Sequence, residues 1–158
     1  MNSIPFIFMA GVVLASFIAL YQVERHRANG VRALANRLDF HYLGNALPLS
    51  LTLGGTPFQA PLKVWNVIDG EPRGIRIIAF DCRVGVGKGS WRRTVIAVES
   101  GDDFSGAVLF NPDMMVESAG KWKILYRPKA FVNFGIAELM PIAELEAHLN
   151  SVGPRANQ

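Results

Sequence analysis

The chain has 158 residues, of which half are hydrophobic, with a formal net charge of +3 and one cysteine, Cys82. This composition is that of a globular domain rather than a disordered tail, and a single cysteine excludes both an intramolecular disulfide and a cysteine-based zinc site. Residues 24–39 carry four Arg against two acids, whereas residues 45–158 carry twelve Lys or Arg against eleven Asp or Glu. A nucleic-acid binder would carry its basic surface on the domain itself, so this distribution argues against one.

The first predicted element is a transmembrane helix over Ile4 to Tyr21, a segment without any charged side chain. A helix of this length would be roughly 27 Å long, close to the bilayer hydrocarbon thickness of about 30 Å. Ten of its residues are Ile, Leu, Val or Phe, and they favour insertion by about 3–6 kcal/mol in total. We therefore predict a membrane anchor over residues 1–23, with a buried helix of a soluble core as the alternative.

The flanks of this segment predict a single-pass topology. No basic residue precedes the segment and no Ala-x-Ala site follows it, which disfavours a cleaved signal peptide. The arginines that follow it would stay in the cytoplasm, so the N-terminus would lie outside the inner membrane and the domain inside the cell. Small residues recur every fourth position and would permit a homodimer through this helix, although such residues are common in anchors generally; they are Gly11, Ala15 and Ala19.

Residues 24–40 are predicted to form a basic juxtamembrane helix, which either continues the anchor or bends near Asn29-Gly30. Its apolar residues recur at helical spacing, at Val31, Leu34, Ala35 and Leu38. Its arginines are candidate contacts for anionic lipid headgroups or a partner protein, or else a solvated face that merely sets topology; they include Arg25, Arg27 and Arg32.

Residues 41–153 are predicted to form one α+β domain, followed by a tail at 154–158. Alternating leucines from Leu47 to Leu53 allow a short edge strand within a loop-like stretch. Period-2 alternation predicts an antiparallel meander of five or six strands, at Lys63–Ile68, Gly74–Val84, Arg93–Glu99, Gly106–Phe110, Lys121–Tyr126 and, more weakly, Phe131–Ile136. A closing helix from Pro141 has the core stripe Ile142, Leu145, Leu149 and Val152. The helices are expected to pack on one face of the sheet.

The segment Gly85 to Ser90 is glycine-rich but lacks the spacing of a phosphate-binding loop, because Gly89 follows Lys88 where Ser or Thr is required. It is predicted to be a hairpin loop between two strands. Basic residues and a tryptophan gather here as a candidate contact with a membrane interface or an anionic partner; the alternative is an exposed basic tip with the tryptophan folded back onto the sheet. The residues are Lys88, Trp91, Arg92 and Arg93.

No residue is predicted to be catalytic. The three histidines stand at no metal-ligand spacing and the chain contains no nucleophile elbow, so neither a metal nor a cofactor is expected. Cys82 shares a strand face with Phe80 and Val84 and is expected to be a buried apolar residue rather than a nucleophile. Asp81 is directed to the other face, where a surface ion pair with Arg83 is expected.

Three stretches of the chain carry a resemblance to known proteins: Val31-Arg32-Ala33-Leu34-Ala35, Trp65-Asn66-Val67-Ile68 with the spaced Gly70 and Gly74, and Ala79-Phe80-Asp81. In these stretches the chain resembles a group of uncharacterised bacterial single-pass membrane proteins without an established activity. The resemblance implies one N-terminal span, a basic juxtamembrane helix and a cytoplasmic α+β domain with a C-terminal helix. No functional residue can be assigned to this chain from the resemblance.

The function expected from these features is a binding or interaction domain held at the cytoplasmic face of the inner membrane. Its partner would be a protein, a lipid surface or a small ligand. One alternative is a membrane-tethered enzyme, which needs a cleft with convergent ionisable groups; His41, Asp39 and either Asp81 or Glu99 within hydrogen-bond reach in a pocket would favour it. Another is a structural subunit of an envelope complex, joined through the anchor or an exposed sheet edge.

Overall fold

The structure is a computed structural model that describes residues 4–59, 62–87, 90–100, 113–128 and 139–151, with the side chains of these residues from Phe8 onward except Ala10 and Leu62. Its helices are α1 (Ile4–Leu38) and α2 (Ile142–Ser151), and two 3-10 turns are η1 (Pro57–Gln59) and η2 (Pro72–Gly74). The strands are β1 (His41–Gly44), β2 (Leu62–Gly70), β3 (Ile77–Val84), β4 (Trp91–Glu99), β5 (Met115–Ala119) and β6 (Trp122–Tyr126). They form one antiparallel sheet of six strands in the order β1-β2-β3-β4-β6-β5. The predicted α+β class is confirmed.

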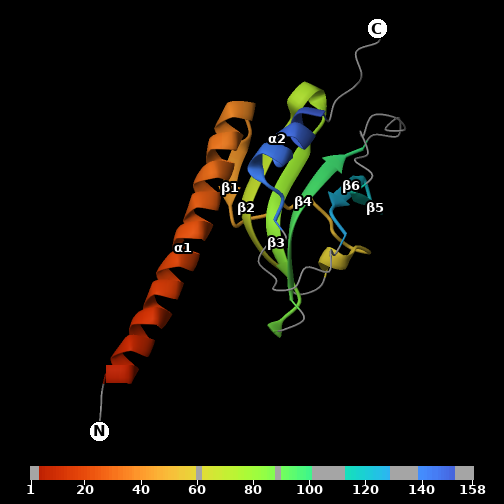
Figure 1. Cartoon of the computed structure of the whole chain (residues 1–158). Helices are drawn as coiled ribbons and strands as arrows, with labels where there is room; N and C mark the ends of the chain where they lie inside the picture. The colour runs from red at the N-terminus through yellow and green to blue at the C-terminus, as the bar shows by residue number, and fades with distance from the viewer. Residues whose placement is uncertain (1–3, 60–61, 88–89, 101–112, 129–138, 152–158) are drawn as a thin grey trace.

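The long helix α1 runs without interruption through Asn29-Gly30 to Leu38. Its carboxyl-terminal part packs on the sheet through Val31, Leu34 and Ala35, each at most 1% exposed. Its amino-terminal half extends away from the sheet (Figure 1). The predicted apolar segment and basic helix are therefore parts of one rigid element.

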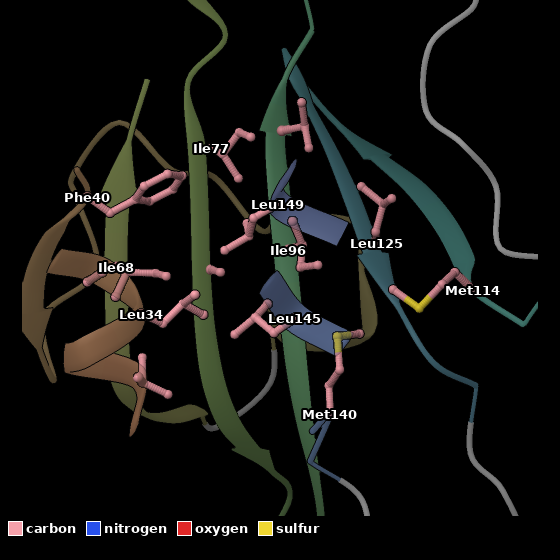
Figure 2. Packing of buried hydrophobic residues seen from close by; sticks show 14 residues of the cluster. Leu34, Phe40, Ile68, Ile77, Ile96, Met114, Leu125, Met140, Leu145 and Leu149 are labelled. Atoms are coloured by element: carbon pink, nitrogen blue, oxygen red, sulfur yellow. The ribbon is translucent and has the colours of Figure 1, made fainter. Parts of the chain in front are cut away.

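Both helices cover the same face of the sheet, as predicted. Leu34 of α1 and Leu145 and Leu149 of α2 pack against Ile77 and Ile96 of the two central strands (Figure 2). Because α2 begins at Ile142, directly after Pro141, the expected proline start of this helix is confirmed.

The opposite face is covered by the chain between β1 and β2. Phe58 and Trp122 are fully buried there, and the Trp122 indole donates to the backbone carbonyl of Ser50 at 2.9 Å. The edge strand predicted at Leu47 to Leu53 is wrong, because residues 45–56 form turns and irregular structure. Leu49 is fully exposed while its neighbouring leucines pack inward, so the alternation does not correspond to one strand face.

Four predicted strands correspond to β2, β3, β4 and β6. The strands β3 and β4 pair antiparallel, as expected of strands joined by a hairpin, and residues 88 and 89 of their connection lie outside the described residues. The strands β1 and β5 are not predicted, because their sequences, HYLG and MVESA, lack the alternation of large apolar residues that β6, WKILY, shows. The strands expected at Gly106–Phe110 and Phe131–Ile136 lie outside the described residues.

Candidate functional site

A buried ion pair joins α1 to the middle of the sheet. Arg27 Nη2 donates to Asp81 Oδ1 at 2.8 Å, and Arg27 Nε donates to Asp81 Oδ2 at 3.0 Å. The Asp81 side chain is only 2% exposed and that of Arg27 is 14% exposed. The predicted surface pair of Asp81 with Arg83 is wrong, because α1 covers this face of β3 and brings Arg27 onto the carboxylate.

The carboxylate of Asp81 is fully hydrogen-bonded. Besides Arg27, Thr94 Oγ1 donates to Oδ1 at 2.7 Å and Asn66 Nδ2 donates to Oδ2 at 2.9 Å. The Thr94 hydroxyl accepts from Arg27 Nη2 and from the Met140 backbone N–H, each at 3.0 Å. Arg27 Nη1 also donates to the Met140 carbonyl at 2.5 Å. These groups, here called the clamp, compensate the two buried charges.

Asn66 reaches the clamp because β2 contains a β-bulge. The register of β2 against β3 shifts by one residue between Trp65 and Ile68. Asn66 adopts a φ of +54°, a left-handed conformation that asparagine tolerates better than most residues. Its side chain is thereby turned toward Asp81, and its Oδ1 accepts a hydrogen bond from the Tyr42 hydroxyl at 3.2 Å.

A cleft of about 380 Å³ lies between α1 and the strands β2, β3 and β4, beside the clamp. Asn66 lines it and is 4% exposed, so the clamp forms part of its floor. Glu24 and Ala28 line it from α1, and the aromatic side chains of Tyr42 and Trp65 line it from the sheet.

The sheet side of this cleft carries three cations in one row. Lys63 lies opposite Arg83, and Arg83 lies opposite Arg92, in the antiparallel register. Residues opposed in this way point to the same face, with Cβ atoms about 4.5–5.5 Å apart. Arg92 donates to Glu24 Oε1 at 3.1 Å, and its guanidinium lies 4.9 Å from the centre of the Trp65 ring. Neither Lys63 nor Arg83 has an ion-pair partner among the described residues. Among the described residues that line the cleft, three are cations and Glu24 is the one anion.

A second cavity of about 450 Å³ is lined by Asp39, His41, Asp69, Glu71 and Arg76 among others. The Arg76 guanidinium is engaged by Asp69, at 2.7 Å from Nη2 to Oδ2 and 3.1 Å from Nε to Oδ1. This hydrogen-bonded pair raises the pKa of Arg76, so the group stays a cation.

The residues expected to converge in an enzyme do not all meet in this second cavity. Asp39 and His41 line it, but Asp81 belongs to the clamp and Glu99 pairs with Lys121 at 2.5 Å. Within the described part of the chain, the acidic, histidine and cysteine side chains form no group of three suited to a metal ion.

The basic residues of α1 that were predicted to meet lipid or a partner occupy different environments. Arg25 is exposed. Arg32 is exposed as well, and its guanidinium lies 4.8 Å from the centre of the Tyr42 ring. Arg27 is engaged in the clamp.

The residues predicted to gather after the hairpin loop are divided between the two faces of β4. Arg92 faces α1 and the cleft. Trp91 packs edge-on against Phe58 with ring centres 5.6 Å apart, and Arg93 is 2% exposed on that same side. Lys88 lies outside the described residues. Alternation along a strand separates side chains that are adjacent in sequence.

Cys82 is buried, as predicted, with no exposed surface. Burial raises the pKa of its thiol from 9.0 to about 12, so the thiol stays protonated at neutral pH. This is the environment of an inert structural cysteine.

The amino-terminal half of α1 exposes apolar side chains in all directions. Ten large hydrophobic residues are 50–74% exposed, namely Phe8, Met9, Val12, Val13, Leu14, Phe17, Ile18, Leu20, Tyr21 and Val23. Ser16 donates its hydroxyl to the Val12 carbonyl of the same helix at 2.8 Å. The small residues predicted to permit a dimer, Gly11, Ala15 and Ala19, lie in this exposed half. Across the described residues, no helix combines the length and the apolar character needed to cross a membrane.

Sequence reasoning missed the clamp and the cleft because their residues come from segments far apart in the chain. The one available signal was a carboxylate, Asp81, in an otherwise apolar strand.

No protein family model, no curated protein and no solved structure matches this chain.

Proposed function

We propose that this protein is a binding domain anchored at the cytoplasmic face of a membrane by the amino-terminal half of α1. The observation that carries the proposal is the set of exposed hydrophobic side chains between Phe8 and Val23. A helix that is apolar on all sides is stable only inside a membrane or a large protein core, and the sheet covers none of this part of α1.

The composition of the whole segment supports a bilayer as the surrounding medium. The apolar run of the sequence starts at Ile4, ahead of the described side chains, and continues without a charged residue to Val23. Ser16 satisfies its hydroxyl within its own helix, as a polar side chain in hydrocarbon must. The first charged side chain is Glu24, which lines the cleft.

The clamp would then fix the domain against the membrane surface. Arg27 follows Tyr21 by six residues, about 9 Å along a helix, and the headgroup layer extends about 5–8 Å beyond the hydrocarbon on each side. A domain fixed at Arg27 would therefore lie at the headgroup boundary. Because α1 is continuous, the angle between the sheet and the membrane would be set by this one helix.

The orientation follows from the charges after the anchor. Four arginines lie within fourteen residues of Val23 on its carboxyl-terminal side, namely Arg25, Arg27, Arg32 and Arg37. Cationic flanks are retained on the cytoplasmic side, which places the cleft and the sheet in the cytoplasm.

The test is membrane fractionation of the full chain expressed in a bacterial host, with an alkaline carbonate wash. We expect the unaltered chain in the washed membrane pellet. Val13→Arg with Phe17→Arg adds about 5–7 kcal/mol to the cost of insertion and leaves eight apolar residues that favour insertion by only about 2–5 kcal/mol, so it should release the chain. Asn29→Arg, an exposed change on the same helix, is the control and should leave it bound. An unaltered chain in the aqueous fraction would refute the anchor.

The orientation is tested separately, with a reporter fused to the C-terminus. An alkaline phosphatase fusion should be inactive, because that enzyme requires the periplasm, and a fluorescent protein fusion should be bright. An active phosphatase would overturn the cytoplasmic placement and leave the anchor itself intact.

A further inference from the structure

We propose that the cleft between α1 and strands β2–β4 is a binding site for a phosphate group, carried by a phospholipid headgroup or by a soluble ligand. The first observation is the row formed by Lys63, Arg83 and Arg92 on three adjacent strands. Like charges directly opposite one another destabilise a sheet. Three cations side by side therefore lower the stability of the folded sheet. A binding site for an anion accounts for this cost, because functional sites are often less stable than they could be.

The second observation concerns the acidic partners of this row among the described residues. Glu24 contacts Arg92, and its side chain is 64% exposed, so the pair is weak. Arg83, the middle cation, and Lys63 are both exposed and have no acidic partner within the described residues. A phosphate oxygen over Arg83 would be within reach of cations on both sides, because adjacent strands are only about 4.8 Å apart.

The third observation is how the cleft is shaped and supported. Its volume of about 380 Å³ exceeds that of a phosphate group and leaves room for an attached glycerol or sugar. The Trp65 ring holds the Arg92 guanidinium at 4.9 Å, and Asn66 is held by the clamp, so the walls are preorganised. Arginine offers paired N–H donors that match phosphate oxygens.

The location of the cleft favours a lipid as the source of the phosphate. Glu24 directly follows Val23, the last exposed hydrophobic residue of α1, so the cleft would open at the headgroup layer. This preference for lipid rests on the proposed membrane anchor, whereas the phosphate site itself does not.

The experiment uses the full chain in neutral dodecyl maltoside micelles and in vesicles. In micelles, inorganic phosphate and glycerol phosphate are titrated at constant ionic strength while the thermal unfolding midpoint is recorded. In vesicles, phosphatidylcholine alone is compared with phosphatidylcholine containing one fifth phosphatidylglycerol. Saturable stabilisation by the soluble phosphates identifies a soluble ligand, and stabilisation by phosphatidylglycerol alone identifies the headgroup. Both results support the site.

Arg83→Gln is the decisive variant, and Arg73→Gln is its control, since it changes the net charge equally at an exposed position outside the cleft. We expect Arg83→Gln to weaken phosphate binding at least tenfold, the loss of one charge-assisted hydrogen bond. It should also raise the unfolding midpoint in anion-free buffer, because it relieves the repulsion within the row. If Arg83 served only to stabilise the fold, the same substitution would lower the unfolding midpoint.

The proposal is overturned if neither soluble phosphate nor phosphatidylglycerol stabilises the unaltered chain. It is also overturned if Arg83→Gln and Arg73→Gln respond alike. Failure of the anchor would be seen in fractionation, while phosphate binding in micelles would persist, so the two failures are distinguishable.

Discussion

Removing the carboxylate of Asp81 should be the most damaging single polar change in the chain. Asp81 accepts four hydrogen bonds, two of them from Arg27, and its side chain is 2% exposed. Asp81→Ala would leave the Arg27 guanidinium buried without its counter-charge, which costs about 3–5 kcal/mol. Asp81→Asn keeps the shape and should cost about 1.5–3 kcal/mol, the value of hydrogen bonds to a charged group.

The assay is urea unfolding of the full chain in mild detergent, followed by tryptophan fluorescence. Asp69→Ala is the matched control, because Asp69 also pairs with an arginine through two hydrogen bonds. The arginine left behind, Arg76, is 32% exposed and can be solvated, so this change should cost only about 1 kcal/mol. Combining Asp81→Ala with Arg27→Met should cost less than the sum of the two single changes. A cost for Asp81→Ala no greater than that of Asp69→Ala, or strict additivity with Arg27→Met, would refute the clamp.

Three further changes test the packing. Phe58→Ala should cost about 3–5 kcal/mol by urea unfolding, because Phe58 is fully buried against Trp91 and Tyr126; a loss under 1 kcal/mol would contradict that packing. Gly70→Ala should cost about 1–3 kcal/mol, since a Cβ there would lie 2.5 Å from the Phe40 ring, whereas Gly54→Ala, with open space around it, should be nearly neutral. The Cys82 thiol should resist maleimide at pH 8 until urea unfolds the chain, and mass spectrometry would detect early labelling if the thiol were accessible. Since the folded-state pKa of Cys82 is raised, its contribution to stability is complete below pH 9.0 and is lost as the pH rises toward about 12.

The elements with strong periodicity could be predicted from the sequence. The helical stripe at Val31, Leu34 and Ala35 and the start of α2 after Pro141 both follow from local patterns. The two edge strands, β1 and β5, show no alternation of large apolar residues, whereas β6, which is as short as β5, does. The leucines from Leu47 to Leu53 alternate along the sequence without forming a strand, because an irregular segment that packs on the sheet can also direct apolar side chains inward.

The candidate site could be predicted only in fragments. Alternation correctly directed Asp81 away from Phe80 and Cys82, but it could not show that α1 covers that face. Arg27 and Asp81 are 54 residues apart, so no local pattern links them. The cation row depends on strand register, which aligns Arg83 with its neighbours only once the sheet has formed.

The central claim is that the amino-terminal half of α1 lies in a bilayer and that the domain begins where this segment ends. It is tested most directly by spin labels introduced singly by cysteine substitution from residue 8 to residue 29 of a Cys82→Ala chain reconstituted in phospholipid vesicles. Collision rates with oxygen and with a water-soluble nickel chelate report the depth of each label. Labels from Phe8 to Val23 should collide often with oxygen and rarely with the nickel chelate. Labels at Glu24 and Arg25 should show the opposite pattern, with frequent nickel collisions. Free access of nickel to labels at Val13 and Phe17 would contradict the account.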